Sequence, residues 1–131
     1  MNNNPTNSKN MNILIIEDEG DISLILNLML KKQDIEIEHV TTIANAGIFL
    51  KQQKTDLVII DNQLPDGFGM DYIKNIKADY PTVKIIMITG NTNNTDKENA
   101  LQNGADFFLA KPFTKEQIQA AIENVSSLRV V

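Results

Sequence analysis

Short apolar runs recur along the chain and are separated by longer amphipathic stretches. The runs lie at residues 13–16, 57–60, 83–88 and 107–109. The first three are almost continuously apolar and rich in β-branched residues, which is typical of strands covered on both faces in a parallel sheet. Residues 35–40 instead alternate apolar and polar side chains, and this alternation predicts a half-exposed strand at an edge of the sheet.

The stretches between the runs carry helical periodicity. The last helix is predicted to have one apolar stripe with the spacing i, i+3, i+4, i+7, formed by Ile118, Ala121, Ile122 and Val125. The inner face of the first helix is predicted to consist of Ile22, Ile25, Leu26 and Met29. That of the third helix is predicted to consist of Met70, Ile73 and Ile76. A second helix is expected at about residues 43–53.

Two pairs of polar residues predict where the last two helices begin. Thr95 and Glu98 have the spacing of a capping box, and so do Thr114 and Gln117. In this motif the first side chain accepts a hydrogen bond from the backbone N–H three residues later. We therefore expect Thr95 and Thr114 at the N-terminal ends of these helices.

The regular alternation of strands and helices predicts an α/β fold. Such a pattern implies right-handed crossovers and a doubly wound parallel sheet. We expect a single flavodoxin-like domain over residues 12–127, with five strands in the order 2-1-3-4-5 and five flanking helices. Residues 1–11 are polar and rich in Asn, and they are predicted to form a disordered leader.

Composition and charge narrow the possible functions. The net charge of −5 and the pI of about 4.7 disfavour direct binding of this segment to nucleic acid, which requires clustered Lys and Arg. Cysteine is absent, which excludes disulfides, thiol catalysis and thiolate metal sites. No run approaches the roughly 18 apolar residues of a membrane span, and no signal peptide is evident. We therefore expect a cytoplasmic protein.

Polar side chains follow the apolar runs where ligands bind in doubly wound sheets, beyond the carboxyl ends of the strands. If the first and third strands are neighbours, Asp18 and Asp61 converge, with Glu17 close by. Three acids with no thiol or imidazole nearby favour a hard cation, and Mg²⁺ is the natural candidate. The only histidine, His39, is interpreted as a surface residue of the edge strand.

Four segments in order resemble the response-regulator receiver domains of two-component signalling. They are ILIIEDE, DLVIIDNQLPDGFG, IIMITG and GADFFLAKPF. Each lies at the end of a predicted strand, and the resemblance covers about residues 12–127.

The resemblance implies a role for each residue of the predicted site. Asp61 corresponds to the phosphoacceptor. Glu17 and Asp18 correspond to the acidic pair that holds Mg²⁺ or Mn²⁺, together with Asp61 and the backbone carbonyl of Gln63. Thr89 and Lys111 correspond to the hydroxyl and the ammonium that contact the phosphoryl group, and the Lys111–Pro112 bond is typically cis.

The resemblance also implies partners and a switch. A histidine kinase or phosphotransfer protein would donate the phosphoryl group. Thr89 would then move inward and Phe108 would repack. This movement would alter the face formed by the fourth helix, the fifth strand and the fifth helix for a downstream protein or effector domain. The domain would catalyse only its own phosphorylation and dephosphorylation.

Three other classes of function share parts of this pattern. A small phosphatase of haloacid-dehalogenase type also uses an Asp nucleophile and Mg²⁺, but it has a second Asp where this chain has Gln63. A flavodoxin-like cofactor binder should have a Ser/Thr/Gly-rich loop after its first strand, whereas the acids here would repel phosphate. A pseudo-receiver used only for interaction is disfavoured because the acids, the hydroxyl residue and the lysine are all present.

Overall fold

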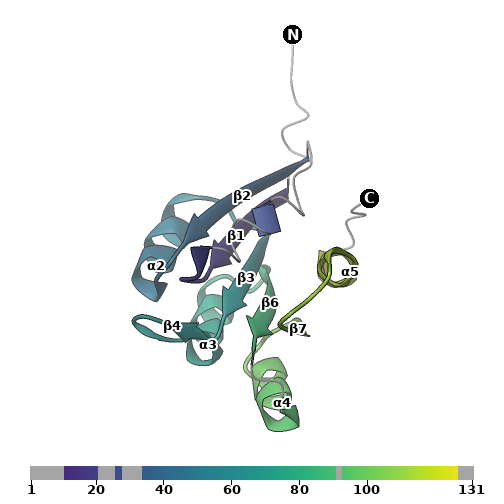
Figure 1. Ribbon diagram of the computed structural model, residues 1–131. Coiled ribbons are helices and arrows are strands. Elements are labelled where there is room, and N and C mark those ends of the chain that lie inside the picture. The colour runs from purple at the N-terminus through teal and green to yellow at the C-terminus, as the bar shows by residue number, and fades with distance from the viewer. Residues whose placement is uncertain (1–10, 21–25, 28–33, 91–92, 127–131) are drawn as a thin grey trace.

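A five-stranded parallel sheet forms the centre of the molecule. The computed structural model describes residues 11–20, 26–27, 34–90 and 93–126. The strands lie in the order β2-β1-β3-β6-β7, which matches the predicted order because β6 and β7 are the fourth and fifth strands of this sheet (Figure 1). Their bounds are Ile35–Val40 for β2, Met11–Ile16 for β1, Leu57–Asp61 for β3, Lys84–Thr89 for β6 and Phe107–Ala110 for β7.

The burial of the strands follows their apolar patterns. Every residue of β3 is buried, and so is every residue of β6 after Lys84. The edge strand β2 alternates half-buried and exposed residues from Ile35 to Glu38, as predicted. Complete burial of one aliphatic side chain stabilises the fold by about 1.5–3 kcal/mol, so the central strands supply much of the driving force for folding.

Helices cover both faces of the sheet, and each face has its own core. One face packs against three helices, α2 (Ile43–Gln52), α3 (Gly69–Asp79) and α4 (Asn94–Gln102). The other face packs against α5 (Lys115–Ser126), whose buried stripe includes Ile118 and Ile122 (Figure 1). Three of the positions predicted for the inner face of the first helix, at 22, 25 and 29, lie outside the described residues. The fourth, Leu26, is helical and fully buried in the α5-side core.

Of the two capping boxes predicted from the sequence, one is correct and one is wrong. Thr114 and Gln117 form the predicted capping box, because Gln117 N donates to Thr114 Oγ1 and Thr114 N donates to Gln117 Oε1. Thr95 does not cap α4. Asn93 does so instead, and its Oδ1 accepts from Asp96 N at 2.8 Å. Asn is at least as good an N-cap as Thr, so the helix begins one residue before Thr95.

A short antiparallel hairpin follows β3 and was not predicted. Its strands are β4 (Gln63–Leu64) and β5 (Gly67–Phe68). The turn sequence Pro65-Asp66-Gly67 is a known signal for such a hairpin, and Gly67 has a φ of +155°. Asp66 Oδ1 accepts from Ile43 N and Oδ2 accepts from Ala44 N, each at 2.9 Å. The hairpin is therefore fastened to the N-terminus of α2.

The hydrogen bonds between Asp66 and the N-terminus of α2 predict that the stability of this contact depends on pH. The hydrogen bonds from Ile43 N and then Ala44 N lower the pKa of Asp66 below its ordinary value of 3.8, against a smaller effect of desolvation. Because the folded-state pKa is lowered, the carboxylate stabilises the fold above the unfolded pKa and this contribution is lost as the pH falls through the folded pKa. A ¹³C NMR titration of the Asp66 carboxyl should have its midpoint below 3.8. A midpoint at or above that value would contradict the assignment.

The close packing around Gly69, at the start of α3, leaves no room for a larger side chain. A Cβ on Gly69 would collide with the backbone carbonyl oxygen of Asp61 and lie 3.0 Å from the Ile60 side chain. We expect Gly69→Ala to destabilise the fold by about 1–3 kcal/mol, the usual cost of overpacking. Urea denaturation measures this. Gly47→Ala is the matched control, because the nearest contact of its Cβ is Tyr72 Oη at an ordinary 3.5 Å. Alanine is favoured inside a helix by about 1 kcal/mol, so the two substitutions should have opposite signs.

Candidate functional site

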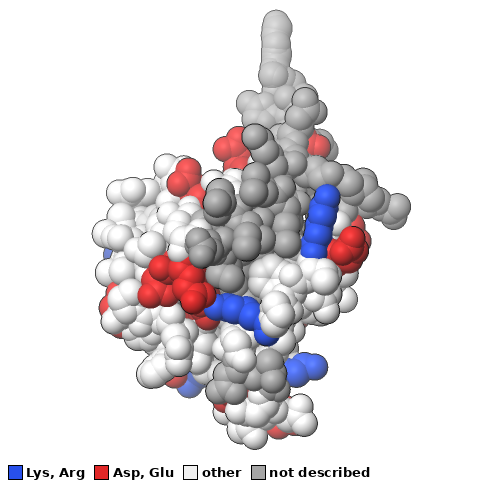
Figure 2. Space-filling view, in the orientation of Figure 1, with Lys and Arg blue, Asp and Glu red and all other residues white. Residues whose placement is uncertain are grey.

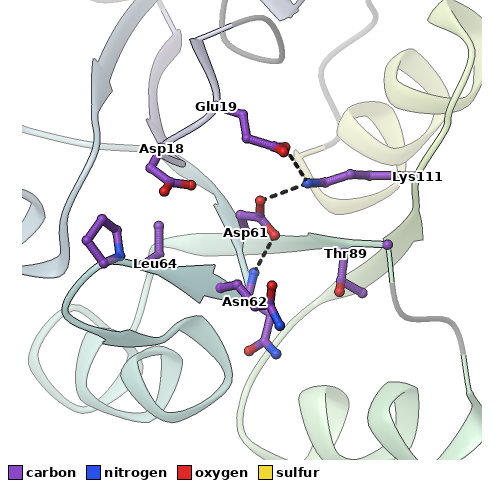
Figure 3. Close-up of a pocket in the computed structure, with 10 residues that line it drawn as sticks. Asp18, Glu19, Asp61, Asn62, Leu64, Thr89 and Lys111 are labelled. Carbon is purple, nitrogen blue, oxygen red and sulfur yellow. Dashed lines mark hydrogen bonds and ion pairs between the residues drawn. The ribbon is translucent and has the colours of Figure 1, made fainter.

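The candidate site is a polar pocket at the carboxyl ends of the strands. Parallel strands that run side by side deliver the residues at their carboxyl ends to one rim. Here the rim is built from the ends of β1, β3, β6 and β7 (Figure 3). The described residues that line the pocket are Asp18, Glu19, Asp61, Asn62, Gln63, Leu64, Pro65, Thr89, Gly90 and Lys111. Five of the predicted site residues are among them, whereas Glu17 and Phe108 are not.

Asp61 is the last residue of β3 and is only 5% exposed. Its Oδ1 accepts a hydrogen bond from Asn62 N at 2.7 Å, and its Oδ2 accepts one from Lys111 Nζ at 2.8 Å. The Asp18 side chain, which follows β1, points toward Asp61 (Figure 3). A nearly buried carboxylate is costly unless it is paired, and both oxygens of Asp61 have partners. The nucleophile candidate is therefore fixed in orientation and open to the pocket.

Lys111 forms ion pairs with two carboxylates of the pocket. Its Nζ lies 2.8 Å from Asp61 Oδ2 and 3.0 Å from Glu19 Oε1. Partial burial lowers the pKa of Lys111, but the hydrogen bonds and charges of Asp61 and Glu19 outweigh this effect and raise the pKa above its ordinary value of 10.5. The ammonium therefore stays charged at neutral pH. Figure 2 shows acidic side chains gathered beside a basic one on this face of the molecule.

Glu19 is a site residue that the sequence pattern did not predict. Its position in the sequence indicates an exposed acid in a turn, and its side chain is exposed. However, it lines the pocket and forms the ion pair with Lys111. These two residues are separated by 92 positions in the chain, so only the fold brings them together. The acidic run directly after β1 was the one available signal.

Glu17 and His39 contact each other, which their positions in the sequence did not indicate. Glu17 is fully buried, and its Oε1 accepts from Glu19 N at 2.6 Å. His39 Nε2 lies 2.8 Å from the Glu17 backbone oxygen and 3.3 Å from Glu17 Oε2. The expectation that no imidazole lies near the acids was therefore wrong, and His39 is only 25% exposed. The parallel pairing of β1 with β2 is the cause, because it sets His39 opposite Ile15, two residues before Glu17.

Thr89 and Phe108 lie on neighbouring strands. Thr89 ends β6, is 6% exposed and lines the pocket. Its backbone oxygen accepts from Lys111 N at 2.9 Å, which ties the ends of β6 and β7 together. Phe108, in β7, lies opposite Met87 and is partly buried against the core beneath α2, α3 and α4. The Lys111–Pro112 bond is cis, as the resemblance implies.

The oxygen-rich donor set of the pocket fits a hard divalent cation. The described residues contain no group of three His, Cys, Asp or Glu side chains placed to hold a metal ion. Mg²⁺ does not need such a group, because it keeps several waters and is held by one or two carboxylates. Asp18, Asp61 and Gln63 line one pocket and can supply two carboxylates and a carbonyl. Glu17 is fully buried and is not one of the residues that line the pocket.

Comparison with known families decides the identity of the domain. A family model described as response regulator receiver domain matches residues 13–123. The chain belongs to this family. The receiver domain contains no described helix that is both long and apolar enough to cross a bilayer.

The receiver domain matches about half the length of several larger regulators. It is 32% identical over 111 residues to the KDP operon transcriptional regulatory protein KdpE of Escherichia coli K12, a match that covers 85% of this chain and 49% of KdpE. The chain thus spans about half the length of the curated relatives it matches.

Solved structures agree with this assignment. The beryllofluoride-activated NtrC4 receiver domain dimer matches with a TM-score of 0.84 at 28% identity, covering 88% of this chain and 96% of that one. A response regulator from Burkholderia pseudomallei, solved with a phosphorylated aspartic acid, a calcium ion and citrate, matches with a TM-score of 0.79 at 25% identity. That match covers 86% of this chain and 66% of the Burkholderia chain.

Proposed function

We propose that this receiver domain accepts a phosphoryl group on Asp61 from a histidine kinase or a phosphotransfer protein, with Mg²⁺ or Mn²⁺ bound beside it. The observation that carries the proposal is the nearly buried Asp61 carboxylate, held by Lys111 and approached by Asp18 in one open pocket. The phosphorylated aspartic acid and the calcium ion of the Burkholderia pseudomallei regulator support both parts of it.

The residues of the pocket divide the chemistry between them. An Asp61 carboxylate oxygen attacks the phosphorus, and the bond from phosphorus to the donor breaks. Lys111 stabilises negative charge on the transferred group, as preorganised cationic donors do in phosphoryl transfer. The Thr89 hydroxyl, which lines the same pocket, would donate to a phosphoryl oxygen. The cation, held by Asp18, Asp61 and the Gln63 carbonyl, would neutralise charge on the phosphoryl oxygens.

Phosphorylation would then switch the face formed by α4, β7 and α5. Thr89 lies beside β7 at the pocket, and Phe108 lies in that same strand. A group that draws Thr89 inward would free space for Phe108 to repack, and a downstream protein or effector domain would respond to the altered face. Phe108 has no hydroxyl, so its movement depends on packing alone. The receiver domain acts as a catalyst only on its own aspartyl phosphate.

Phosphorylation by a small phosphodonor tests the proposal. The chain is incubated with acetyl phosphate and Mg²⁺, and its intact mass is recorded beside a sample containing a chelator. One added phosphoryl group that requires the metal is the expected result. A short-lived acyl phosphate could escape detection, so a beryllofluoride titration monitored by NMR accompanies the mass measurement. If neither phosphorylation nor beryllofluoride binding occurs, the domain is a pseudo-receiver and the proposal is wrong.

A further inference from the structure

The buried Glu17 carboxylate is hydrogen-bonded to the acidic turn formed by residues 17–19. Its Oε1 accepts from Glu19 N at 2.6 Å and so closes the turn that carries Asp18 and Glu19. Asp18 and Glu19 line the pocket, and Glu19 also contacts Lys111. The Glu17 side chain is therefore hydrogen-bonded to the backbone of the turn that carries the two pocket acids.

His39 contacts Glu17 at two points from the neighbouring strand. Its Nε2 lies 2.8 Å from the Glu17 backbone oxygen and 3.3 Å from Glu17 Oε2. The Glu17 backbone oxygen can only accept, so this hydrogen bond requires a proton on Nε2. The contact with Oε2 is an approach at ion-pair distance and is not a hydrogen bond. Glu17 N donates to Val40 O at 3.1 Å, which brings β2 alongside the start of the turn.

We propose that His39 is a positioning residue of the metal site. Its Nε2–H donates to the Glu17 backbone oxygen and so holds the start of the turn that Glu17 Oε1 closes by accepting from Glu19 N. This inference rests on the proposed Mg²⁺-dependent function. The nearest precedent in physical terms is the outer hydrogen bond that orients a metal ligand, whose loss typically costs about 10–100-fold in metal affinity.

Two other roles for His39 fit the contacts less well. Direct metal binding is disfavoured, because Mg²⁺ prefers oxygen ligands and His39 Nε2 already contacts the Glu17 backbone oxygen. A purely structural staple between β1 and β2 is unnecessary, because the two strands already pair continuously from Met11 and Ile35 to Ile16 and Val40. The contacts instead connect His39 with the turn that carries Asp18.

A titration with Mg²⁺ alone, monitored by the amide resonances of the ¹⁵N-labelled chain, tests this role. We expect His39→Leu to weaken Mg²⁺ binding by about 10-fold or more. His39→Gln, whose side-chain N–H can replace Nε2–H, should restore binding to within about 3-fold of the unaltered chain. Glu36→Leu is the matched control, because Glu36 is an exposed residue of the same strand that faces Asn12.

A second measurement does not depend on the variants. In the unaltered chain, the neutral imidazole of His39 should carry its proton on Nε2, which long-range ¹H–¹⁵N correlation spectra report directly. A proton on Nδ1 instead would overturn the inference. So would equal loss of Mg²⁺ affinity in the Gln and Leu variants, or no loss in His39→Leu. If the unaltered chain bound no Mg²⁺, the proposed function would fail and this inference with it.

Discussion

Asp61→Asn is expected to abolish phosphorylation of the chain by acetyl phosphate and to leave the fold intact. Asparagine has nearly the same volume as aspartate, and its side-chain oxygen can still accept from Asn62 N. It lacks the anionic oxygen that would attack phosphorus, so no covalent adduct can form at this position. Intact-mass spectrometry with acetyl phosphate and Mg²⁺ measures the loss, and urea denaturation monitors the fold.

A second Asp→Asn variant controls for the lost charge. Asp71 is exposed in the first turn of α3 and is not one of the pocket-lining residues. Asp71→Asn should accept one phosphoryl group at the rate of the unaltered chain. If Asp61→Asn also gained the added mass, another side chain would be the acceptor, and the assignment of Asp61 would be wrong.

Lys111→Met is expected to have opposite effects on phosphoryl transfer and on metal binding. The Lys111 ammonium lies between Asp61 Oδ2 and Glu19 Oε1, at 2.8 and 3.0 Å. Removing a preorganised group that stabilises developing charge typically slows a reaction by about 10²–10³-fold. The same change removes a positive charge that opposes a cation, so Mg²⁺ should bind at least as tightly as before. A general loss of structure would weaken both.

The two readouts are the initial rate of phosphorylation by acetyl phosphate and the Mg²⁺ titration by NMR. Lys115→Met is the control, because Lys115 is exposed at the start of α5 and is not one of the pocket-lining residues. It should leave both quantities unchanged. A phosphorylation rate of Lys111→Met within about 3-fold of the unaltered chain would refute an electrostatic role for this lysine.

The apolar pattern of the sequence by itself determined the fold class and the order of the central elements. Continuous β-branched runs are stable only where both faces are covered, so they identify the inner strands of a parallel sheet. Alternation in residues 35–40 identified the edge strand in the same way. The ends of parallel strands share one rim, and this rule directed attention to Asp18 and Asp61. The resemblance to receiver domains added Thr89 and Lys111.

Local hydrogen-bonding choices were harder to predict, because neighbouring residues compete for them. Thr95 and Asn93 each stand three residues before an acid, and both are acceptable N-caps. The structure selects Asn93. The hairpin after β3 had a clear turn sequence in Pro65-Asp66-Gly67, but its attachment to α2 depends on a contact between residues 23 positions apart.

Only the tertiary structure decided how the acids are supported. The Glu19–Lys111 pair spans 92 positions and the Glu17–His39 contact spans 22. Such contacts depend on the register between strands, and a shift of one residue would turn each side chain to the opposite face of the sheet. The sequence predicted that Asp18, Asp61 and Lys111 belong to one site, but it did not predict Glu19. Only the fold determined that Lys111 pairs with both Asp61 and Glu19. It also determined that the His39 imidazole contacts Glu17 at the start of the acidic turn.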